Sequence, residues 1–343
     1  MIAPRKTLKI HPRQSHPRRN ASIFSTGAYL PEKVLTNADL EKIVDTTDEW
    51  ITTRTGIKER RIAAEGEMTS DMGAAAALQA MQEGGIKPEE IDLIICATCT
   101  PDTIFPSTAC HIQEKIGAKR AAAFDIQAAC SGFLYGLIVA EQFIASHVYE
   151  TVLVIGAEKL SSIVNWKDRN TCVLFGDGAG AVIVRNRQDG HGLLASDMGA
   201  DGSQTDILSL PAGGCRLPVT ADVIDQQLHT LQMSGREVYK YAVNAMNDSA
   251  ERCLAKAGID SSEISLIIPH QANVRIIESV AQKMKAPLSR CYINLDRYGN
   301  MSAACIPVAL HEAAKKGMLH QGDIILLVAF GGGLTWASAV LEW

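Results

Sequence analysis

GIKPEEIDLII at residues 85–95 returns as GIDSSEISLII at residues 258–268, with seven of eleven positions identical. Each copy follows an alanine-rich amphipathic segment and ends in an apolar run, which is the order helix, turn, strand. Two further apolar runs, 151–157 and 323–329, are separated by nearly the same length of sequence. A separation near half of the 343-residue chain indicates a duplicated α/β unit, although chance similarity between helix–turn–strand segments is the alternative.

Short apolar runs alternate with longer helical patterns from residue 21 onward, which is typical of an α/β protein. The apolar runs predict strands over residues 93–98, 122–126, 151–157, 181–185, 266–268, 291–294 and 324–330. The helical patterns predict helices over residues 70–83, 131–146, 236–257, 274–285 and 302–316. We expect residues 21–190 and 191–343 to be two similar halves of one integrated catalytic unit.

The first 20 residues carry six basic and no acidic side chains. They contain no apolar core of the kind that secretory signals have. We expect residues 1–20 to form a disordered basic extension, and a short targeting peptide is the alternative.

Composition and charge exclude several classes of protein. The chain has 33 Lys and Arg against 38 Asp and Glu, a net charge of −5, whereas nucleic-acid binders are usually strongly basic. No apolar run approaches the ~20 residues of a membrane-spanning helix. Nine cysteines, several of them inside apolar runs, favour a reduced cytoplasmic protein over a disulfide scaffold. Cys96 and Cys99 have metal-ligand spacing, but without a second pair we expect no metal site.

The first candidate for chemistry is Cys130, in FDIQAACSGF at residues 124–133. An apolar strand gives way to small residues and then to a helix predicted from Ser131, which puts the thiol at a helix N-terminus. Unpaired backbone N–H groups and the helix dipole stabilise a thiolate at such a position. The alternative is an ordinary cysteine packed in the core.

Two further candidates lie in the second half of the chain. His270, in PHQAN at residues 269–273, stands just past a strand, at the sheet edge where open α/β folds bind ligands. Asn300 stands between a strand and a helix, roughly where Cys130 stands in the first half. A hydrogen-bonded structural histidine and a helix-capping asparagine are the alternatives. If the halves pack about a pseudo-twofold axis, the thiol, imidazole and amide converge as an acyl-transfer set.

Two glycine-rich segments, FGDGAG at residues 175–180 and FGGG at residues 330–333, fit neither the dinucleotide-binding nor the P-loop spacing. Closely packed turns would account for each of them. The second segment ends a predicted strand, where a backbone N–H could also donate to an oxyanion.

Taken together, the motifs resemble β-ketoacyl-acyl-carrier-protein synthase III, the condensing enzyme that begins bacterial type II fatty acid synthesis. The resemblance covers residues 21–343 and is carried, in order, by WITTRTGI (50–57), ACSG (129–132), FGDGAG, PHQAN, GNMS (299–302) and FGGG. It implies the thiolase fold, a five-layer αβαβα arrangement of two similar halves. It also implies a cytoplasmic homodimer.

The resemblance further implies a two-stage reaction without a cofactor, in which acyl-CoA is a substrate. Cys130 attacks the thioester of an acyl-CoA primer, commonly acetyl-CoA. The acyl-enzyme then receives the carbanion that forms when malonyl-acyl carrier protein loses CO₂. His270 and Asn300 form the oxyanion hole for decarboxylation, with Phe330 behind them, and the backbone N–H groups of Cys130 and Gly332 hold the oxyanion of acyl transfer.

Substrate and partner contacts are implied at further positions. Those that match CoA contacts are Trp50, Arg54, Arg169 and Asn273. Those that match the acyl pocket are Leu160, Phe330 and, reaching over from the second subunit of a dimer, Phe105. Those that match the docking surface for acyl carrier protein are Lys240, Gln271, Arg275 and Lys283. The alternatives are core packing for Phe105 and Leu160 and ordinary solvated side chains for the lysines.

Acyl carrier protein is acidic, so a local basic patch has to overcome the net negative charge of this chain. The main alternative function is that of a related ketosynthase of polyketide metabolism with a different primer. A non-catalytic scaffold of the same fold is disfavoured by the intact Cys–His–Asn set, and a papain-like hydrolase by the duplicated α/β pattern. We expect neither nucleic acid nor a membrane as a partner.

Overall fold

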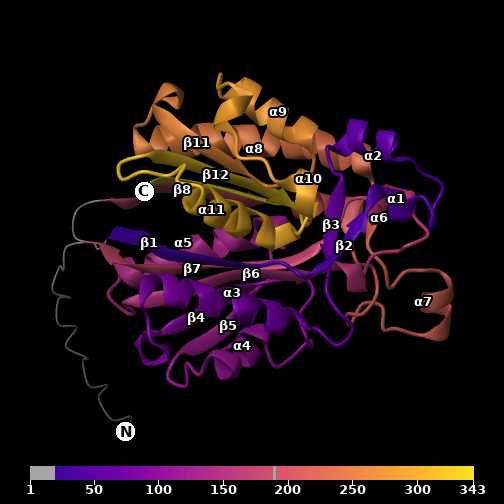
Figure 1. Ribbon diagram of the computed structural model, residues 1–343, viewed down its shortest axis with the longest axis horizontal. Helices are drawn as coiled ribbons and strands as arrows, with labels where there is room; N and C mark the ends of the chain where they lie inside the picture. The colour runs from indigo at the N-terminus through magenta and orange to yellow at the C-terminus, as the bar shows by residue number, and fades with distance from the viewer. Residues whose placement is uncertain (1–19, 188–190) are drawn as a thin grey trace, which may run out of the picture.

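Two stacked β-sheets form the framework of the protein (Figure 1). The computed structural model describes residues 20–187 and 191–343, so the expected basic extension lies outside the described residues except for Asn20. The first sheet has the order β1 (Asn20–Tyr29), β7 (Asp177–Arg187), β6 (Thr151–Lys159), β4 (Leu93–Ala97), β5 (Ala122–Ile126). The second has the order β11 (Ile264–Pro269), β12 (Ile324–Gly331), β13 (Thr335–Glu342), β8 (Gly192–Ala200).

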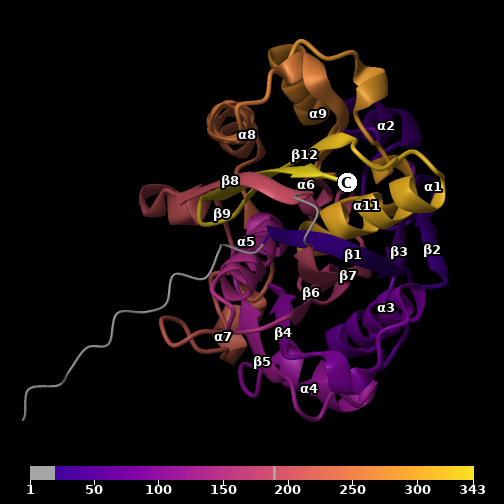
Figure 2. The same cartoon turned by 90° about the vertical axis from the view of Figure 1, so that its left-hand side faces the viewer.

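Helices fill the space between the sheets and cover both outer faces. The two central helices, α5 (Gly132–Ala145) and α11 (Cys305–Lys315), share one apolar core with strands of both sheets (Figures 1 and 2). The first sheet is covered by α3 (Thr69–Gly84) and α4 (Thr108–Ile116), the second by α8 (Gly235–Ala257) and α9 (Val274–Lys283). This arrangement confirms the predicted five-layer αβαβα fold. Among the described residues, no helix is long and apolar enough to cross a bilayer.

The repeated segments adopt the same local structure in both halves. Gly85 ends α3 and Gly258 ends α8, with φ of 62° and 70°, in the left-handed region that glycine adopts without steric cost. A 3-10 turn follows in each copy, Pro88–Glu90 and Ser261–Glu263. The glutamate that closes each turn accepts a hydrogen bond from the backbone N–H three residues earlier, at 2.9 and 2.7 Å. The identities in the repeat therefore mark a helix end, a capped turn and a buried strand.

One predicted strand is wrong. Within 291–294 only Cys291 pairs with a strand, through a single bridge to Ile267, and the chain then enters the short helix α10 (Leu295–Tyr298). The pairing stops because the backbone N–H of Asn294 donates to a side chain, that of Gln271, instead of to a neighbouring strand. The other predicted strands and helices overlap the observed ones, although the last helix begins as a 3-10 turn before α11.

Three long strands, β1, β8 and β13, are not among the predicted elements. β8 and β13 are rich in Gly, Ala and Ser, as in GLLASDMGA and TWASAVLE, which weakens the apolar alternation that marks a strand. The helix α4 and several short elements were also missed, and most of the short ones gather at one end of the molecule (Figure 1). They are β2 (Lys33–Thr36), α1 (Asn37–Leu40), α2 (Asp48–Thr55), β3 (Glu59–Ile62), α6 (Arg169–Cys172), β9 (Leu208–Ser209), α7 (Ala221–Asp225) and β10 (Gln232–Met233).

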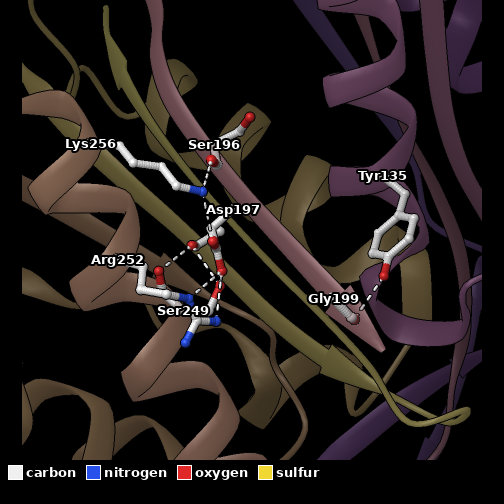
Figure 3. Close-up of polar contacts among 8 residues, drawn as sticks. Tyr135, Ser196, Asp197, Gly199, Ser249, Arg252 and Lys256 are labelled. Atoms are coloured by element: carbon white, nitrogen blue, oxygen red, sulfur yellow. Dashed lines mark hydrogen bonds and ion pairs between the residues drawn. The ribbon is translucent and has the colours of Figure 1, made fainter. Parts of the chain in front are cut away.

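Polar contacts hold β8 from both of its faces (Figure 3). On the outer face, the Asp197 carboxylate accepts hydrogen bonds from Arg252 at 2.8 Å and from Lys256 at 2.7 Å, both on α8. On the inner face, the Tyr135 hydroxyl of α5 donates to the carbonyl oxygen of Gly199 at 2.8 Å. These contacts fix an outer helix and a central helix to the same edge strand.

Candidate active site

A cavity of about 1000 Å³ lies where the two halves meet. Its wall includes Cys130 from the first half and His270 and Asn300 from the second. The structure thus brings together the three side chains that the sequence singles out. No group of three or more His, Cys, Asp or Glu side chains suited to a metal ion is found within residues 20–187 and 191–343.

Cys130 lies in a 3-10 turn, Ala129–Ser131, that leads directly into α5. This is the predicted position at a helix N-terminus, but the expected stabilised thiolate is not what the surroundings favour. Burial raises the pKa of the Cys130 thiol to about 12, the Ser302 hydroxyl opposes that rise, and the carboxylate of Glu158 adds to it. Desolvation is the largest of these effects, so the surroundings favour the neutral thiol.

The glycine-rich end of β12 packs directly on Cys130. A side chain at Gly331 would place its Cβ 2.6 Å from the backbone nitrogen of Cys130, so only glycine allows this approach. Gly332 and Phe330, on either side of it, line the cavity. In the other glycine-rich segment all six residues, 175–180, are buried, and Asp177 accepts hydrogen bonds from Ala63 and Ser161. That segment is close-packed structure at the start of β7.

His270 follows β11 immediately and is almost fully buried. Its backbone N–H donates to the carbonyl oxygen of Val328 at 2.8 Å, which fixes the residue against β12. Burial lowers the pKa of the imidazole to about 3. The ring is therefore neutral at physiological pH, and a neutral imidazole is a hydrogen-bond donor that carries no charge of its own.

Asn300 is held by its backbone and by its side chain. Its N–H donates to the carbonyl oxygen of Leu174 at 2.8 Å, and it forms a single parallel bridge with Phe175. Its Oδ1 accepts the backbone N–H of Ser302 at 2.8 Å. Because this bond occupies the oxygen end of the amide, the NH₂ end remains available to donate to a substrate.

Asn300 lies close to the position equivalent to Cys130 but does not occupy it. The turn Ala129–Ser131 before α5 corresponds to the turn Ser302–Ala304 before α11. Both turns begin with a residue at φ of 46°, Ala129 and Ser302. The register of the repeat, which matches Gly85 with Gly258, matches Cys130 with Ala303. The second half supplies its donor from the loop before the equivalent turn.

Gln271 cannot be a docking residue. Its side chain is fully buried, and its Nε2 donates to the carbonyl oxygens of Pro269 at 2.7 Å and Tyr292 at 3.0 Å. Its Oε1 accepts the backbone N–H of Asn294 at 3.0 Å. Every polar group of the amide is used inside the protein, so the prediction that Gln271 binds acyl carrier protein is wrong.

The residues predicted to contact CoA gather on one aromatic ring. The guanidinium carbons of Arg54 and Arg169 lie 4.7 and 5.1 Å from the ring centroid of Trp50. Both arginines are exposed, and Trp50 is half-buried. Asn273 caps α9, lines the cavity and donates from Nδ2 to the carbonyl oxygen of Arg54 at 3.0 Å. The four residues thus form a continuous wall from the ring to the cavity.

The predicted acyl-pocket residues divide into two groups. Leu160 and Phe330 line the cavity and are buried. Phe105 does not line the cavity of its own chain, and 85% of its surface is exposed, on the loop between β4 and α4. Phe105 is therefore not a core residue of this chain, which was the alternative.

The remaining cationic positions lie on the surface. Lys240 on α8 and Lys283 on α9 are exposed, and Lys283 forms an ion pair with Glu251 at 3.4 Å. Arg275 is exposed in the first turn of α9, and its Nη2 donates to the carbonyl oxygen of Thr53 at 3.1 Å.

Sequence reasoning missed three polar residues beside Cys130. Cys99 and Ser302 line the cavity, and Glu158 is fully buried at the end of β6. The one available signal was in TVLVIGAEK at residues 151–159, where a carboxylate ends an otherwise apolar strand. Cys99 and Ser302 carry no such signal, because small polar residues are common in loops.

Two models of one family match the chain. They are described as 3-oxoacyl-[acyl-carrier-protein (ACP)] synthase III, matching residues 124–202, and as the C terminal of the same synthase, matching residues 254–343.

Curated relatives and solved structures agree with these models. The β-ketoacyl-[acyl-carrier-protein] synthase III of Caldanaerobacter subterraneus subsp. tengcongensis is 55% identical over 323 residues, which cover 94% of this chain and 98% of that protein. The corresponding protein of Desulfitobacterium hafniense is 52% identical, over 94% of this chain and 98% of its own length. The crystal structure of 3-oxoacyl-[acyl-carrier-protein] synthase III from Aquifex aeolicus is 53% identical, with a TM-score of 0.88, over 94% of this chain and all of that one. The chain belongs to the β-ketoacyl-[acyl-carrier-protein] synthase III family.

Proposed function

We propose that the protein catalyses the decarboxylative condensation of an acyl-CoA primer, most often acetyl-CoA, with malonyl-acyl carrier protein. The products are 3-oxoacyl-acyl carrier protein, CoA and CO₂, and the reaction initiates fatty acid synthesis. The observation that carries this proposal is the convergence of Cys130, His270 and Asn300 on one cavity. Membership of the synthase III family supports it.

In the first half-reaction, the sulfur of Cys130 attacks the thioester carbonyl and CoA leaves as a thiol. Covalent catalysis divides one difficult condensation into two easier steps. The backbone N–H groups of Cys130 and Gly332 would hold the negative charge on the thioester oxygen. Cys130 lies in η2 (Ala129–Ser131), which contacts the end of β12, and Gly332 directly follows β12. In this proposal acyl-CoA takes part as a substrate and not as a cofactor.

In the second half-reaction, malonyl-acyl carrier protein loses CO₂ and its thioester oxygen becomes enolate-like. The neutral imidazole of His270 and the NH₂ group of Asn300 would donate to that oxygen. Neutral donors suit this step because they stabilise the negative charge that develops on the thioester oxygen. A cationic donor would also bind the malonyl carboxylate before it is lost as CO₂. Loss of one such donor typically costs ~10²–10³ in rate.

The arginine–tryptophan wall supports binding of the adenine of CoA. An adenine base would stack on the Trp50 ring in place of one of the two guanidinium groups that lie over it. Asn273 lies further in, on the cavity wall, where the pantetheine arm would pass on its way to Cys130.

Acyl carrier protein would dock on the face formed by α8 and α9. Lys240, Arg275 and Lys283 are exposed there, and Asn273 and Ile276 at the start of α9 line the cavity. The formal net charge of the chain is −5, so this local basic surface has to supply the attraction for an acidic partner.

A homodimer would complete the acyl pocket. β5 is one of the two edge strands of the first sheet, and nearby Ile104 and Phe105 are 84% and 85% exposed. Pairing of two copies along this edge would cover the apolar pair and bring Phe105 of one subunit to the cavity of the other. We place the enzyme in the cytoplasm.

A ketosynthase of polyketide metabolism is the second candidate function. A priming β-ketosynthase from the R1128 polyketide pathway has the same fold, with a TM-score of 0.89, but is only 31% identical to this chain. The identities of 55% and 53% to the synthase III proteins of Caldanaerobacter and Aquifex favour the first function.

The test is to supply acetyl-CoA and malonyl-acyl carrier protein and to measure the 3-oxoacyl product. Wild type should form it, whereas His270→Ala and Asn300→Ala should still load acetyl groups but lose most of the decarboxylation. A failure of wild type to elongate malonyl-acyl carrier protein with any short acyl-CoA would refute the proposed function.

A further inference from the structure

The thiol of Cys130 has to lose a proton when its sulfur attacks a thioester. Burial keeps its pKa near 12, so hydroxide in neutral solution removes that proton only rarely. His270 is a poor acceptor, because burial lowers its pKa to about 3. The set of Cys130, His270 and Asn300 therefore contains no effective base for the first half-reaction.

A buried carboxylate lies on the other side of the nucleophile. Glu158, the eighth residue of β6, is fully buried, and no ion pair with Lys or Arg is found for it in the part of the chain that the structure describes. Its Oε2 accepts hydrogen bonds from Thr100 Oγ1 at 2.7 Å and Cys99 N at 3.0 Å. Thr98 Oγ1 also donates to Oε2, at 3.3 Å, and Cys99 N makes a longer contact with Oε1, at 3.2 Å. Burial raises the pKa of Glu158, which makes it a stronger base than an exposed carboxylate.

The side chain of Glu158 points toward the turn that holds Ser302. Side chains two residues apart on a strand share a face, so Glu158 shares the face of Gly156. A Cβ at Gly156 would lie 2.2 Å from the carbonyl oxygen of Ala303, which places the turn Ser302–Ala304 directly on that face. The carboxylate and the turn are therefore neighbours by backbone geometry.

Ser302 stands between the carboxylate and the nucleophile. It lines the same cavity as Cys130, and its turn is in contact with the turn of Cys130 and with β6. The Ser302 hydroxyl lowers the pKa of Glu158, of Cys130 and of Cys99. The other titratable groups around the thiol are Cys99, Cys305 and His270. Burial raises the pKa of both cysteines and lowers that of His270, so none of the three is charged at neutral pH.

We propose that Ser302 and Glu158 form a proton relay that serves Cys130 in acyl transfer. As the bond from sulfur to the thioester carbon forms, the S–H proton of Cys130 passes to the Ser302 oxygen. The Ser302 hydroxyl proton passes at the same time to the Glu158 carboxylate. The new Ser302 hydroxyl faces the sulfur, and Glu158 becomes neutral, which removes a negative charge from beside the reacting centre.

The relay runs backward when CoA leaves. The tetrahedral intermediate collapses, the bond from carbon to the CoA sulfur breaks, and that sulfur recovers the proton from Glu158 by way of Ser302. The net change is the transfer of an acyl group from the CoA sulfur to the Cys130 sulfur and of one proton in the opposite direction. No further reactant is required.

The test compares Ser302→Gly and Glu158→Gln with wild type. Glycine relieves the positive φ of Ser302 and keeps the N–H that binds Asn300, so the donor to the enolate is preserved. Glutamine keeps the size of Glu158 and its contact with Thr100. Ser338→Ala is the matched control, because it also removes a buried hydroxyl, which bonds only within the second half.

The measurement is the rate of Cys130 acetylation against pH, with acetyl-CoA and separately with p-nitrophenyl acetate, which needs no CoA-binding site. Wild type and Ser338→Ala should be nearly independent of pH from neutral to mildly alkaline pH. Both relay variants should be slower at neutral pH by ~10²-fold, the usual contribution of a general base. Their rates should rise about tenfold per pH unit as hydroxide takes over.

This inference rests on the proposed function for its substrate, but the two can fail separately. Acetylation of Cys130 by the ester but not by any acyl-CoA would refute the proposed function and leave the relay standing. The relay is overturned if, with the ester, the acetylation rates of the variants depend on pH in the same way as the rate of wild type, even if those rates are lower. A purely structural defect lowers the rate without changing its dependence on pH.

Discussion

The backbone N–H of Asn294 donates to the Oε1 of Gln271 at 3.0 Å, which ties the segment leading to Asn300 to the residue that follows His270. The same amide donates to the carbonyl oxygens of Pro269 and Tyr292. One buried side chain therefore bridges the two loops that carry the proposed enolate donors. The distance between these donors depends on Gln271, although it faces no substrate.

Replacing Gln271 with Met should impair decarboxylation more than acyl loading. Methionine keeps the volume but leaves buried backbone groups without partners, at a cost of about 1–3 kcal/mol in unfolding free energy. The decarboxylation rate of malonyl-acyl carrier protein should fall at least ~10-fold through misplacement of the donors. Acetylation of Cys130 should change little. Gln113→Met on α4 breaks one similar bond, to Ala121, and is the control; equal losses in both half-reactions would contradict a positioning role for Gln271.

Glu312→Gln should remove stability that depends on pH. Glu312 accepts hydrogen bonds from Arg297, Tyr298 and Asn294, at 2.8, 2.7 and 2.9 Å. Burial raises its pKa, but these bonds prevail and lower the pKa to about 2. Its stabilisation is therefore present above the unfolded value near 4.5 and is lost as the pH falls from there toward 2.

Urea unfolding measures this effect. At pH 7 the unfolding free energy of wild type should exceed that of Glu312→Gln by about 3 kcal/mol, because the pKa falls from 4.5 to about 2 and each pKa unit is worth 1.36 kcal/mol. The difference should shrink steadily below pH 4.5. If the difference in unfolding free energy between wild type and Glu312→Gln is the same at pH 3 and at pH 7, the charge on Glu312 does not contribute to stability.

Arg275→Glu should raise the KM for malonyl-acyl carrier protein by about 10-fold and leave acetyl-CoA loading intact, because it reverses a charge on the proposed docking face. The effect should weaken with added salt. Arg275 also bonds to Thr53 beside the CoA wall, whereas Lys283 pairs only with Glu251 among the described residues. Lys283→Glu therefore separates docking from CoA binding. If both variants lose loading as much as elongation, the surface is not a docking site.

Trp50→Ala should raise the KM for acetyl-CoA by ~10–100-fold, since a base stacked on an aromatic ring is worth ~1–3 kcal/mol. Acetylation by p-nitrophenyl acetate should be unaffected, because that ester has no adenine. Trp50→Phe retains an aromatic face under Arg54 and Arg169 and should recover part of the loss. Equal sensitivity of both substrates would mean that Trp50 supports the fold and not the nucleotide.

Much of the fold follows from local rules. Gly85 and Gly258 had to end helices, and the apolar runs after them had to be buried strands, so the repeat alone predicted two similar layers. Cys130 and His270 were predictable for a related reason, because each stands where a strand ends and the chain turns toward the middle of the molecule.

Other features depend on contacts between distant segments and leave no local pattern. Gln271 stands in a motif full of polar residues, and only its burial shows that it bonds inward. The segment 291–294 is apolar enough for a strand, but the backbone N–H of Asn294 donates to the Gln271 side chain instead of to a neighbouring strand. The pKa of Cys130 depends mainly on its burial. That burial arises from the packing of distant segments and cannot be predicted from the position of Cys130 at a helix N-terminus.

Cys130 should be the residue that accepts the acyl group of acyl-CoA. The most direct measurement is the mass of the intact protein after incubation with acyl-CoAs of increasing chain length. Wild type should gain the mass of one acyl group, located on Cys130 by peptide mapping, with short primers preferred, and Cys130→Ala should gain nothing. No gain on wild type with any primer, or a gain that persists in Cys130→Ala, would show that Cys130 is not the acyl acceptor.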